Sequence, residues 1–375
     1  MTFHARDLTR PPTRPLTLGF LTPHNVHDPR SFSGTAHYAA RALNRIEGVH
    51  LRLLGQHRRP RLGDRLTRRF GRHDDTPGVP APSDLAGLDA VVGLVASGLL
   101  DGMPPDFPFL HVTDATPGFL EDVYGRDVST DARLSEARVA RRAVACVYSS
   151  SMMASRARSE LGLTHAEVLP FGVNLDLPPI IPVQESPIRP LELLYVGTDW
   201  ARKGGEIALA TLAHLRAIGL AAHLTCVGRV PDHVKAAPDV SVVGFLDKSR
   251  PRHARRLASL YARAHLLILP TRGDCTPMVI AEAMAHGTPV LATDTGGISE
   301  MIGHGGAGRT LPMTARAEDW AEAIADMTRD PDAYAWMSDA ARDRARTRFA
   351  WDAWARGILN IARTGIAARD ARLAS

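Results

Sequence analysis

The chain has few cysteines, and they do not form a recognisable framework. The three in 375 residues, Cys146, Cys226 and Cys275, match neither a disulfide scaffold nor a metal-binding motif in their spacing. This excludes a small disulfide-stapled secreted domain and favours a reducing compartment. No apolar run approaches the length that crosses a bilayer, and residues 1–15 are too polar for a signal peptide. We therefore expect a cytoplasmic protein.

Lysine is equally scarce. It occurs only at Lys203, Lys235 and Lys248, so 42 of the 45 basic residues are arginine. A lysine that stands inside a motif is therefore informative. The rest of the composition is that of an ordinary globular protein, with 45% hydrophobic and 23% charged residues. Because 375 residues exceed the usual size of a single hydrophobic core, two domains are expected.

Hydrophobic segments alternate between the strand and the helix pattern in both halves of the chain. In the first half, strands are predicted at 16–21, 50–54, 90–95, 107–112, 145–148 and 168–171, with helices at 36–46 and 151–161. Prolines at 178, 179, 182, 187 and 190 then mark a linker. In the second half, strands are predicted at 191–196, 222–227, 240–243, 266–269 and 290–292, and helices at 206–218, 253–264, 317–329 and 331–348.

This alternation predicts an α/β protein of two doubly wound, Rossmann-like domains with a cleft between them. The expected domains are 1–186 and 187–349, followed by a C-terminal helix within 350–375 that begins near 350 and ends near 362.

The most specific pattern lies between Leu266 and Glu300. A buried strand runs into a loop, Thr276 is a good N-cap, and Pro277 suits the first turn of a helix that ends at Gly287. The next strand follows directly. Such a β-α-β unit presents unpaired N–H groups at the carboxyl edge of a parallel sheet, where α/β proteins commonly bind phosphates.

Two carboxylates accompany this unit. Asp274 precedes the helix and Glu282 lies on it, so they are separated along the helix axis. Because carboxylates accept paired hydrogen bonds from neighbouring hydroxyls, one suits a sugar near the phosphates and the other a ribose. Gly296 and Gly297 mark a second helix start just beyond.

A second motif opens the second domain. The strand that begins at 191 ends at Gly197, and a glycine-led helix begins after Gly205. Between them stand two cations, Arg202 and Lys203. A guanidinium and an ammonium aimed at a departing diphosphate stabilise the charge that develops on it.

Together these motifs resemble the retaining glycosyltransferases of family 4, also described as glycosyl transferases group 1, which have the GT-B fold. That family shows an acidic residue, seven residues and a Glu, then Gly-Gly-x-x-Glu, and Gly-x-x-x-x-Arg/Lys-Lys-Gly at the second-domain start. Here Asp274 stands where the family usually has Glu, and Cys275-Thr276-Pro277 replaces Gly-Phe-Gly.

The resemblance implies a hexosyltransferase that uses a nucleotide-diphosphate sugar and a glycan or lipid-linked acceptor, as in polysaccharide biosynthesis. The second domain would hold the donor and the first domain would admit the acceptor. The donor-site residues carried over are Arg202, Lys203, Asp274 and Glu282, with Gly197, Gly296, Gly297 and the backbone of Cys275, Thr276, Pro277, Met278 and Val279.

In the first domain the sequence resembles the family only in outline, at single positions. Gly34 resembles the family's glycine loop, whose backbone approaches the donor phosphates. Many members place a histidine at the end of the strand that here covers 107–112. By spacing, that position is Asp114, which we expect to contact the donor sugar. His111 lies three residues earlier and reads as an ordinary core histidine, although a role in the site stays open.

No metal or other cofactor is expected. In retaining transfer the departing phosphate oxygen can accept the acceptor's proton, so no strong protein base is required. The pair Asp330 and Asp332 lies between two predicted helices and reads as a helix cap.

Residues 57–73 contain seven arginines. This run is a solvated loop or, from Arg58 to Arg72, a contact with anionic lipid headgroups at the inner membrane face or with an acidic glycan. Nucleic acid is not expected, because no aromatic stacking platform accompanies the run. Two rival functions remain: a non-catalytic protein of the same fold that binds sugar nucleotides or glycans, and a sugar-phosphate synthase or phosphorylase.

Overall fold

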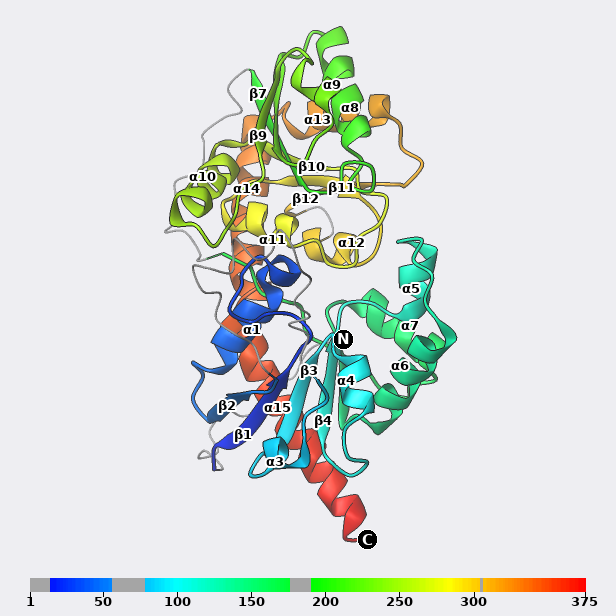
Figure 1. Cartoon of the computed structure of the whole chain (residues 1–375). Helices are drawn as coiled ribbons and strands as arrows, with labels where there is room; N and C mark the ends of the chain where they lie inside the picture. Colours follow the sequence, from blue (N-terminus) through cyan, green and yellow to red (C-terminus); the bar gives the residue numbers. More distant parts are fainter. Residues whose placement is uncertain (1–13, 56–77, 176–189, 304–305) are drawn as a thin grey trace, which may run out of the picture.

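The computed structural model describes residues 14–55, 78–175, 190–303 and 306–375. Within them the chain forms two six-stranded parallel sheets, the first from the N-terminal half and the second from the C-terminal half (Figure 1). The predicted α/β, doubly wound class is confirmed. The predicted boundary at 186 and 187 and most of the linker prolines lie outside the described residues.

The first sheet has the strand order β2-β1-β3-β4-β5-β6, so the winding reverses between β1 and β3. Its strands are β1 (Leu16–Leu21), β2 (Val49–Leu53), β3 (Ala90–Leu94), β4 (Phe109–Thr113), β5 (Ala145–Tyr148) and β6 (Glu167–Val168). The accompanying helices are η1 (Ser31–Gly34), α1 (Thr35–Leu43), α3 (Pro82–Leu85), α4 (Ser97–Asp101), α5 (Pro117–Asp122), α6 (Thr130–Arg142) and α7 (Ser151–Leu161).

The second sheet has the order β12-β11-β10-β7-β8-β9, and its winding reverses between β10 and β7. Its strands are β7 (Leu191–Gly197), β8 (Ala222–Gly228), β9 (Val240–Gly244), β10 (Leu266–Leu269), β11 (Val290–Thr293) and β12 (Gly308–Leu311). Its helices are α8 (Gly205–Ala217), α9 (Asp232–Lys235), α10 (Pro251–Arg263), α11 (Met278–Ala285), α12 (Ile298–Ile302), α13 (Ala317–Met327) and α14 (Pro331–Arg348).

Most predicted elements agree with the structure to within a few residues. The strand predicted at 168–171 is wrong, because β6 covers Glu167–Val168 and the chain then leaves the sheet. Helices η1, α3, α4, α5, α6 and α9 and strand β12 were not predicted. α6 has many charged residues and only three buried side chains, so its apolar periodicity is weak.

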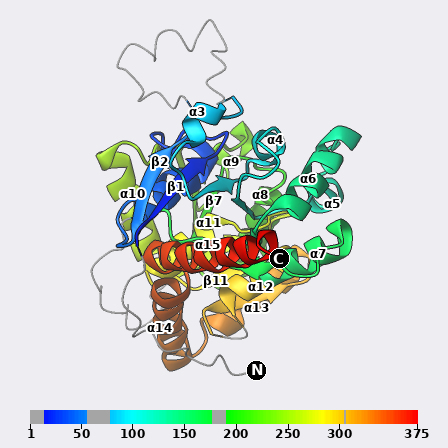
Figure 2. The ribbon, with the colours of Figure 1, turned by 90° about the horizontal axis from the view of Figure 1, so that it is seen from below.

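The final helix, α15 (Trp351–Leu373), is longer than predicted and packs against α1 and β5 of the first sheet. In Figure 1 it runs down along the first domain, and Figure 2 shows it crossing the underside of the molecule. Trp351 stacks on Phe171 with ring centroids 6.1 Å apart, and Trp354 meets Trp351 edge-on. These buried aromatic rings fasten the chain's last helix to the first domain. No described helix has the length and apolar composition needed to cross a membrane.

Candidate functional site

A cleft of about 1050 Å³ lies between the two sheets. The loops that follow β7 and β10 form much of its second-domain wall, to which the end of β8 and the segment after β9 also contribute. These strands are neighbours at the point where the winding reverses, and such a point opens a crevice at the carboxyl edge of a parallel sheet. The sequence motifs are therefore brought together by topology, although they are some seventy residues apart.

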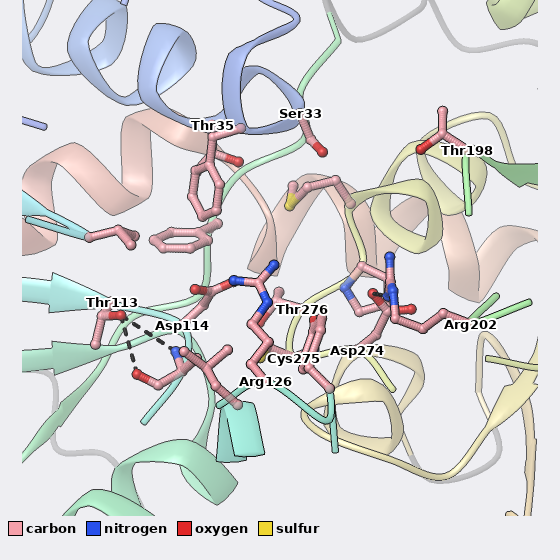
Figure 3. A pocket seen from close by; sticks show the side chains of 18 of the residues that line it. Ser33, Thr35, Thr113, Asp114, Arg126, Thr198, Arg202, Asp274, Cys275 and Thr276 are labelled. Carbon is pink, nitrogen blue, oxygen red and sulfur yellow. Dashed lines mark hydrogen bonds and ion pairs between the residues drawn. The ribbon is translucent and has the colours of Figure 1, made fainter. Parts of the chain in front are cut away.

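Asp274 lies beside Arg202 (Figure 3) and forms hydrogen bonds with both predicted cations. Its carboxylate accepts hydrogen bonds from Lys203 Nζ at 2.8 and 2.9 Å, from Arg202 at 3.2 Å and from the Thr271 hydroxyl at 2.7 Å. The Asp274 and Lys203 side chains are only 8% and 12% exposed. The structure thus differs from the expected separation of cations and acids, since the first carboxylate contacts both cations and fixes their position.

Glycines allow this packing. Gly204 has φ +70°, and a Cβ atom there would lie 1.8 Å from the Pro270 carbonyl oxygen. Any larger residue would push apart the turn that carries Lys203 and the loop that carries Asp274. Gly197 lines the cleft, where a Cβ would crowd the Lys203 side chain at 3.2 Å.

The second carboxylate, Glu282, is 3% exposed and has a lysine partner of its own. It accepts hydrogen bonds from Lys248 Nζ at 2.7 Å and from the Tyr261 hydroxyl at 3.0 Å. Burial, followed by the charge of Glu282, raises the pKa of Tyr261 far above its usual range, so the hydroxyl stays a donor. Lys248 was not predicted as a site residue, and the scarcity of lysine was the signal that could have found it.

The N-terminus of α11 faces the cleft. Thr276, Pro277, Met278 and Val279 all line it. The N–H groups of Met278 and Val279 have no partner within the helix, whereas that of Ile280 donates to the Pro277 carbonyl at 3.0 Å. Thr276 was predicted to be the N-cap, but Pro277 takes that position. The Thr276 hydroxyl instead pairs with the Ser149 hydroxyl of the first domain at 2.6 Å.

Tyr124 joins the two walls and was also missed. Its hydroxyl accepts the Cys275 N–H at 3.1 Å, and its ring lies 5.2 Å from the Arg202 guanidinium and 5.5 Å from that of Arg126. The Cys275 side chain itself is buried. A tyrosine of the first domain thus orders a cation and a loop of the second.

Asp114 follows β4 and lines the first-domain wall, where Arg126 points toward it (Figure 3). Burial raises its pKa to about 6, and the negative charge of Asp274 adds to the shift, whereas its own backbone N–H and Arg126 oppose it. Asp114 therefore changes its charge close to neutral pH. Perturbed carboxylates of this kind are typical of functional clefts.

His111 is fully buried within β4, and its Nε2 lies 2.7 Å from Glu136 of α6. Glu136 also accepts a hydrogen bond from Ser97. Burial alone would raise the pKa of Glu136, but His111 and Ser97 hold it below the ordinary value. His111 is a core histidine, as the sequence suggested, with Nε2 paired to Glu136 and Nδ1 buried without a hydrogen-bond partner among the described residues. Its partner Glu136, not the ring, lines the cleft.

Three predicted donor-site glycines do not line the cleft. Gly34 takes φ +94° to begin α1, and its neighbours Ser33 and Thr35 face the cleft instead. Gly296 and Gly297 pack behind the Asp274 loop, where a Cβ on Gly296 would lie 1.9 Å from the Asp274 carbonyl oxygen. The glycines are needed there for close backbone contact, which sequence alone does not distinguish from phosphate binding.

The remaining predictions concern metal and membrane contacts. Asp330 caps α14 through the N–H groups of Asp332 and Ala333, as expected. The absence of a metal requirement stays a prediction. The arginine-rich run 57–73 lies outside the described residues, so its proposed membrane contact also stays a prediction.

Comparison with solved structures defines the class. The chain superposes on the sucrose-phosphate synthase of Thermosynechococcus elongatus with a TM-score of 0.71 and 20% identity, covering 94% of this chain and all of that one. The Anabaena protein HepE, solved in complex with UDP, superposes with a TM-score of 0.66 and 16% sequence identity. This match covers 93% of this chain and all of HepE. The fold is therefore GT-B, as the resemblance implied.

The sequence family follows. Residues 190–330 match the model of the glycosyl transferases group 1 family. A D-inositol 3-phosphate glycosyltransferase of Rhodococcus erythropolis is 30% identical over 217 residues, which cover 54% of this chain and 42% of the relative. A protein of the same name from Corynebacterium aurimucosum is 34% identical over 120 residues, which cover 32% of this chain and 27% of that protein. The matched stretches thus span less than half of these relatives.

Proposed function

We propose that the protein is a retaining glycosyltransferase that moves a hexose from a nucleotide-diphosphate sugar to a glycan or lipid-linked acceptor. One observation carries the proposal: Arg202, Lys203, Asp274 and Glu282, named from two separate motifs, all line one interdomain cleft. Had their side chains pointed away from a shared crevice, the proposal would have had no basis. The family match and the UDP-bound structural relative support the same donor class.

The donor diphosphate would lie against Arg202, Lys203 and the first turn of α11. There two cations and free N–H groups stabilise the negative charge that grows as the glycosidic bond breaks. Because this charge is met by protein groups, we propose that transfer needs no metal. Asp274 holds the cations in place and already accepts four hydrogen bonds, so a sugar hydroxyl that binds it would replace one of these donors.

The ribose would lie at Glu282, further along α11, and the hexose between Asp274 and Asp114. The acceptor hydroxyl would approach from the first-domain wall and attack the anomeric carbon on the face that the diphosphate leaves. As the new bond forms and the old bond breaks, the acceptor's proton passes to the departing phosphate oxygen.

A thermal-shift panel of UDP-, GDP- and ADP-sugars tests donor binding first. A ligand at one hundred times its Kd adds about 2.7 kcal/mol to the apparent stability. We expect one nucleotide series to raise the Tm and the others to leave it unchanged. If no nucleotide sugar raises the Tm, the proposed function fails.

Calorimetry and product analysis then separate an enzyme from a binding protein. Transfer or slow donor hydrolysis, with the product's anomeric configuration retained by NMR, supports the proposal. Tight donor binding with neither reaction would favour the non-catalytic alternative. The acceptor panel should contain phosphorylated and unphosphorylated sugars, because turnover of a phosphorylated sugar alone would favour a sugar-phosphate synthase.

A further inference from the structure

Lys248 connects the two walls of the cleft. It follows β9 in the second domain, and its side chain is 16% exposed. Besides its bond to Glu282, the ammonium donates to the Ser33 carbonyl of the first domain at 3.0 Å. Its neighbour Asp247 lies 3.7 Å from Arg30 of the same first-domain loop. Two consecutive side chains thus hold this loop from across the cleft.

The loop that they hold has an unusual backbone. Phe32 and Ser33 have φ values of +49° and +56°, in the left-handed region that side chains other than glycine rarely adopt. Such a conformation persists only where the surroundings enforce it. Hydrogen bonds to the Ser33 carbonyl hold the loop in this conformation, because the carbonyl accepts from both Lys248 and Asn174.

The contacts continue on both sides of Ser33. Asn174 is fully buried, donates also to the Thr35 hydroxyl, and accepts the Trp351 indole N–H at the start of α15. On the other side Lys248 leads to Glu282 and from there to Tyr261. A continuous hydrogen-bonded chain therefore runs from the last helix, through the first-domain loop, to the carboxylate assigned to the ribose.

We propose that Lys248 is a positioning residue that couples donor binding to the closed arrangement of the two domains. This inference rests on the proposed function, since Glu282 must hold the donor. A carboxylate held by an ammonium and a tyrosine hydroxyl is oriented for the ribose hydroxyls. The same ammonium keeps the loop 31–34 against the second domain, so the donor meets a cleft whose walls are already in contact.

The test compares Lys248→Met with Lys235→Met. Methionine keeps an unbranched side chain and removes the ammonium. Lys235 is a matched control, because it lies in the same domain, is 58% exposed and, among the described residues, pairs with Asp232 alone, on its own helix. Backbone hydrogen exchange of residues 31–36 is measured without any donor. We expect about tenfold faster exchange in Lys248→Met and no change in Lys235→Met.

Calorimetry with UDP, GDP and ADP and steady-state kinetics complete the test. In Lys248→Met we expect the Kd for the bound nucleotide and the donor KM to rise about tenfold, with kcat within threefold of the parent. A variant that merely misfolds would instead show a lower apparent kcat at an unchanged donor KM, because a smaller fraction of the protein would be active. Lys248→Arg should restore the affinity to within threefold, because the guanidinium can still bridge Glu282 and Ser33.

The outcomes separate the two hypotheses. Equal exchange in the two methionine variants, or unchanged nucleotide affinity in Lys248→Met, would overturn the coupling role. If exchange rises in Lys248→Met but the parent protein binds none of the three nucleotides, the proposed function is refuted, and with it the coupling to a donor, while the contact between loop and second domain is upheld.

Discussion

The two walls of the cleft hold their carboxylates in different ways. In the second domain, Asp274 and Glu282 are buried and each is paired with a lysine. On the first wall, Asp114 forms no ion pair within the described part of the chain, and burial raises its pKa to about 6. The second wall therefore holds these two carboxylates in ion pairs, whereas the first wall contains a carboxyl, Asp114, whose charge changes with modest acidification. We therefore expect the strength of donor binding to depend mainly on the second wall, and the pH dependence of activity to come from Asp114 on the first wall.

The largest effect is expected on the second wall, at Lys203. Lys203→Met removes an ammonium aimed at the departing diphosphate, so kcat/KM should fall roughly 100- to 1000-fold. Steady-state kinetics measure this, with Lys235→Met as the control. The double variant Lys203→Met, Asp274→Asn leaves no unpaired carboxylate, and should keep a Tm near the parent's while staying inactive. Near-normal transfer by Lys203→Met would refute its role.

Glu282→Ala should lower kcat/KM about 100-fold, mainly through a higher donor KM, because the ribose position that we propose lies away from the reacting atoms. The buried Tyr261 and Lys248 also lose their partner, at a cost of about 1–3 kcal/mol in the free energy of unfolding. Urea denaturation measures the second effect. A kcat defect at unchanged donor KM would place Glu282 at the reacting centre and not at the ribose.

Asp114→Asn tests the first wall, where we expect a loss of about tenfold in kcat/KM at pH 8, since an amide accepts the sugar's hydrogen bond less strongly than a carboxylate. In the parent, kcat/KM should fall as the pH drops through about 6, and the variant should lack this step.

The free energy of unfolding should change with pH in the opposite direction to kcat/KM. Because the folded carboxyl binds its proton more tightly than the unfolded one, stability relative to Asp114→Asn should rise as the pH falls from about 6 toward 4. Identical pH profiles would contradict the assignment.

The smallest effect is expected where the walls touch. Tyr124→Leu removes the ring beside Arg202 and the acceptor for the Cys275 N–H. A cation–π contact of about 1 kcal/mol corresponds to roughly a fivefold loss of kcat/KM. Tyr124→Phe keeps the ring and should lose less. If both variants behave alike, the hydroxyl and not the ring orders the second wall.

Much of the second wall could be read from the sequence because its signals are local. A buried strand, a loop acid and a glycine-led helix start follow one another within each motif, and strand alternation places both loops at the same sheet edge. Arg202, Lys203, Asp274 and Glu282 were found in this way. The same local reading also assigned Gly296 and Gly297 to the donor site. The structure shows that they instead permit close backbone packing, which a glycine pair allows as readily as phosphate contact.

The sequence by itself determined two parallel sheets, most strands and most of the longer helices, and which loops carry charge, because hydrophobic period and capping act over a few residues. Only the tertiary structure decided the partners: Lys248 with Glu282, Tyr124 with Arg202, Glu136 with His111. These pairs join residues 25 to 78 positions apart only because the chain's winding brings distant segments together. A side chain's charge is local, but its neighbour, and hence its pKa and role, is set by the fold.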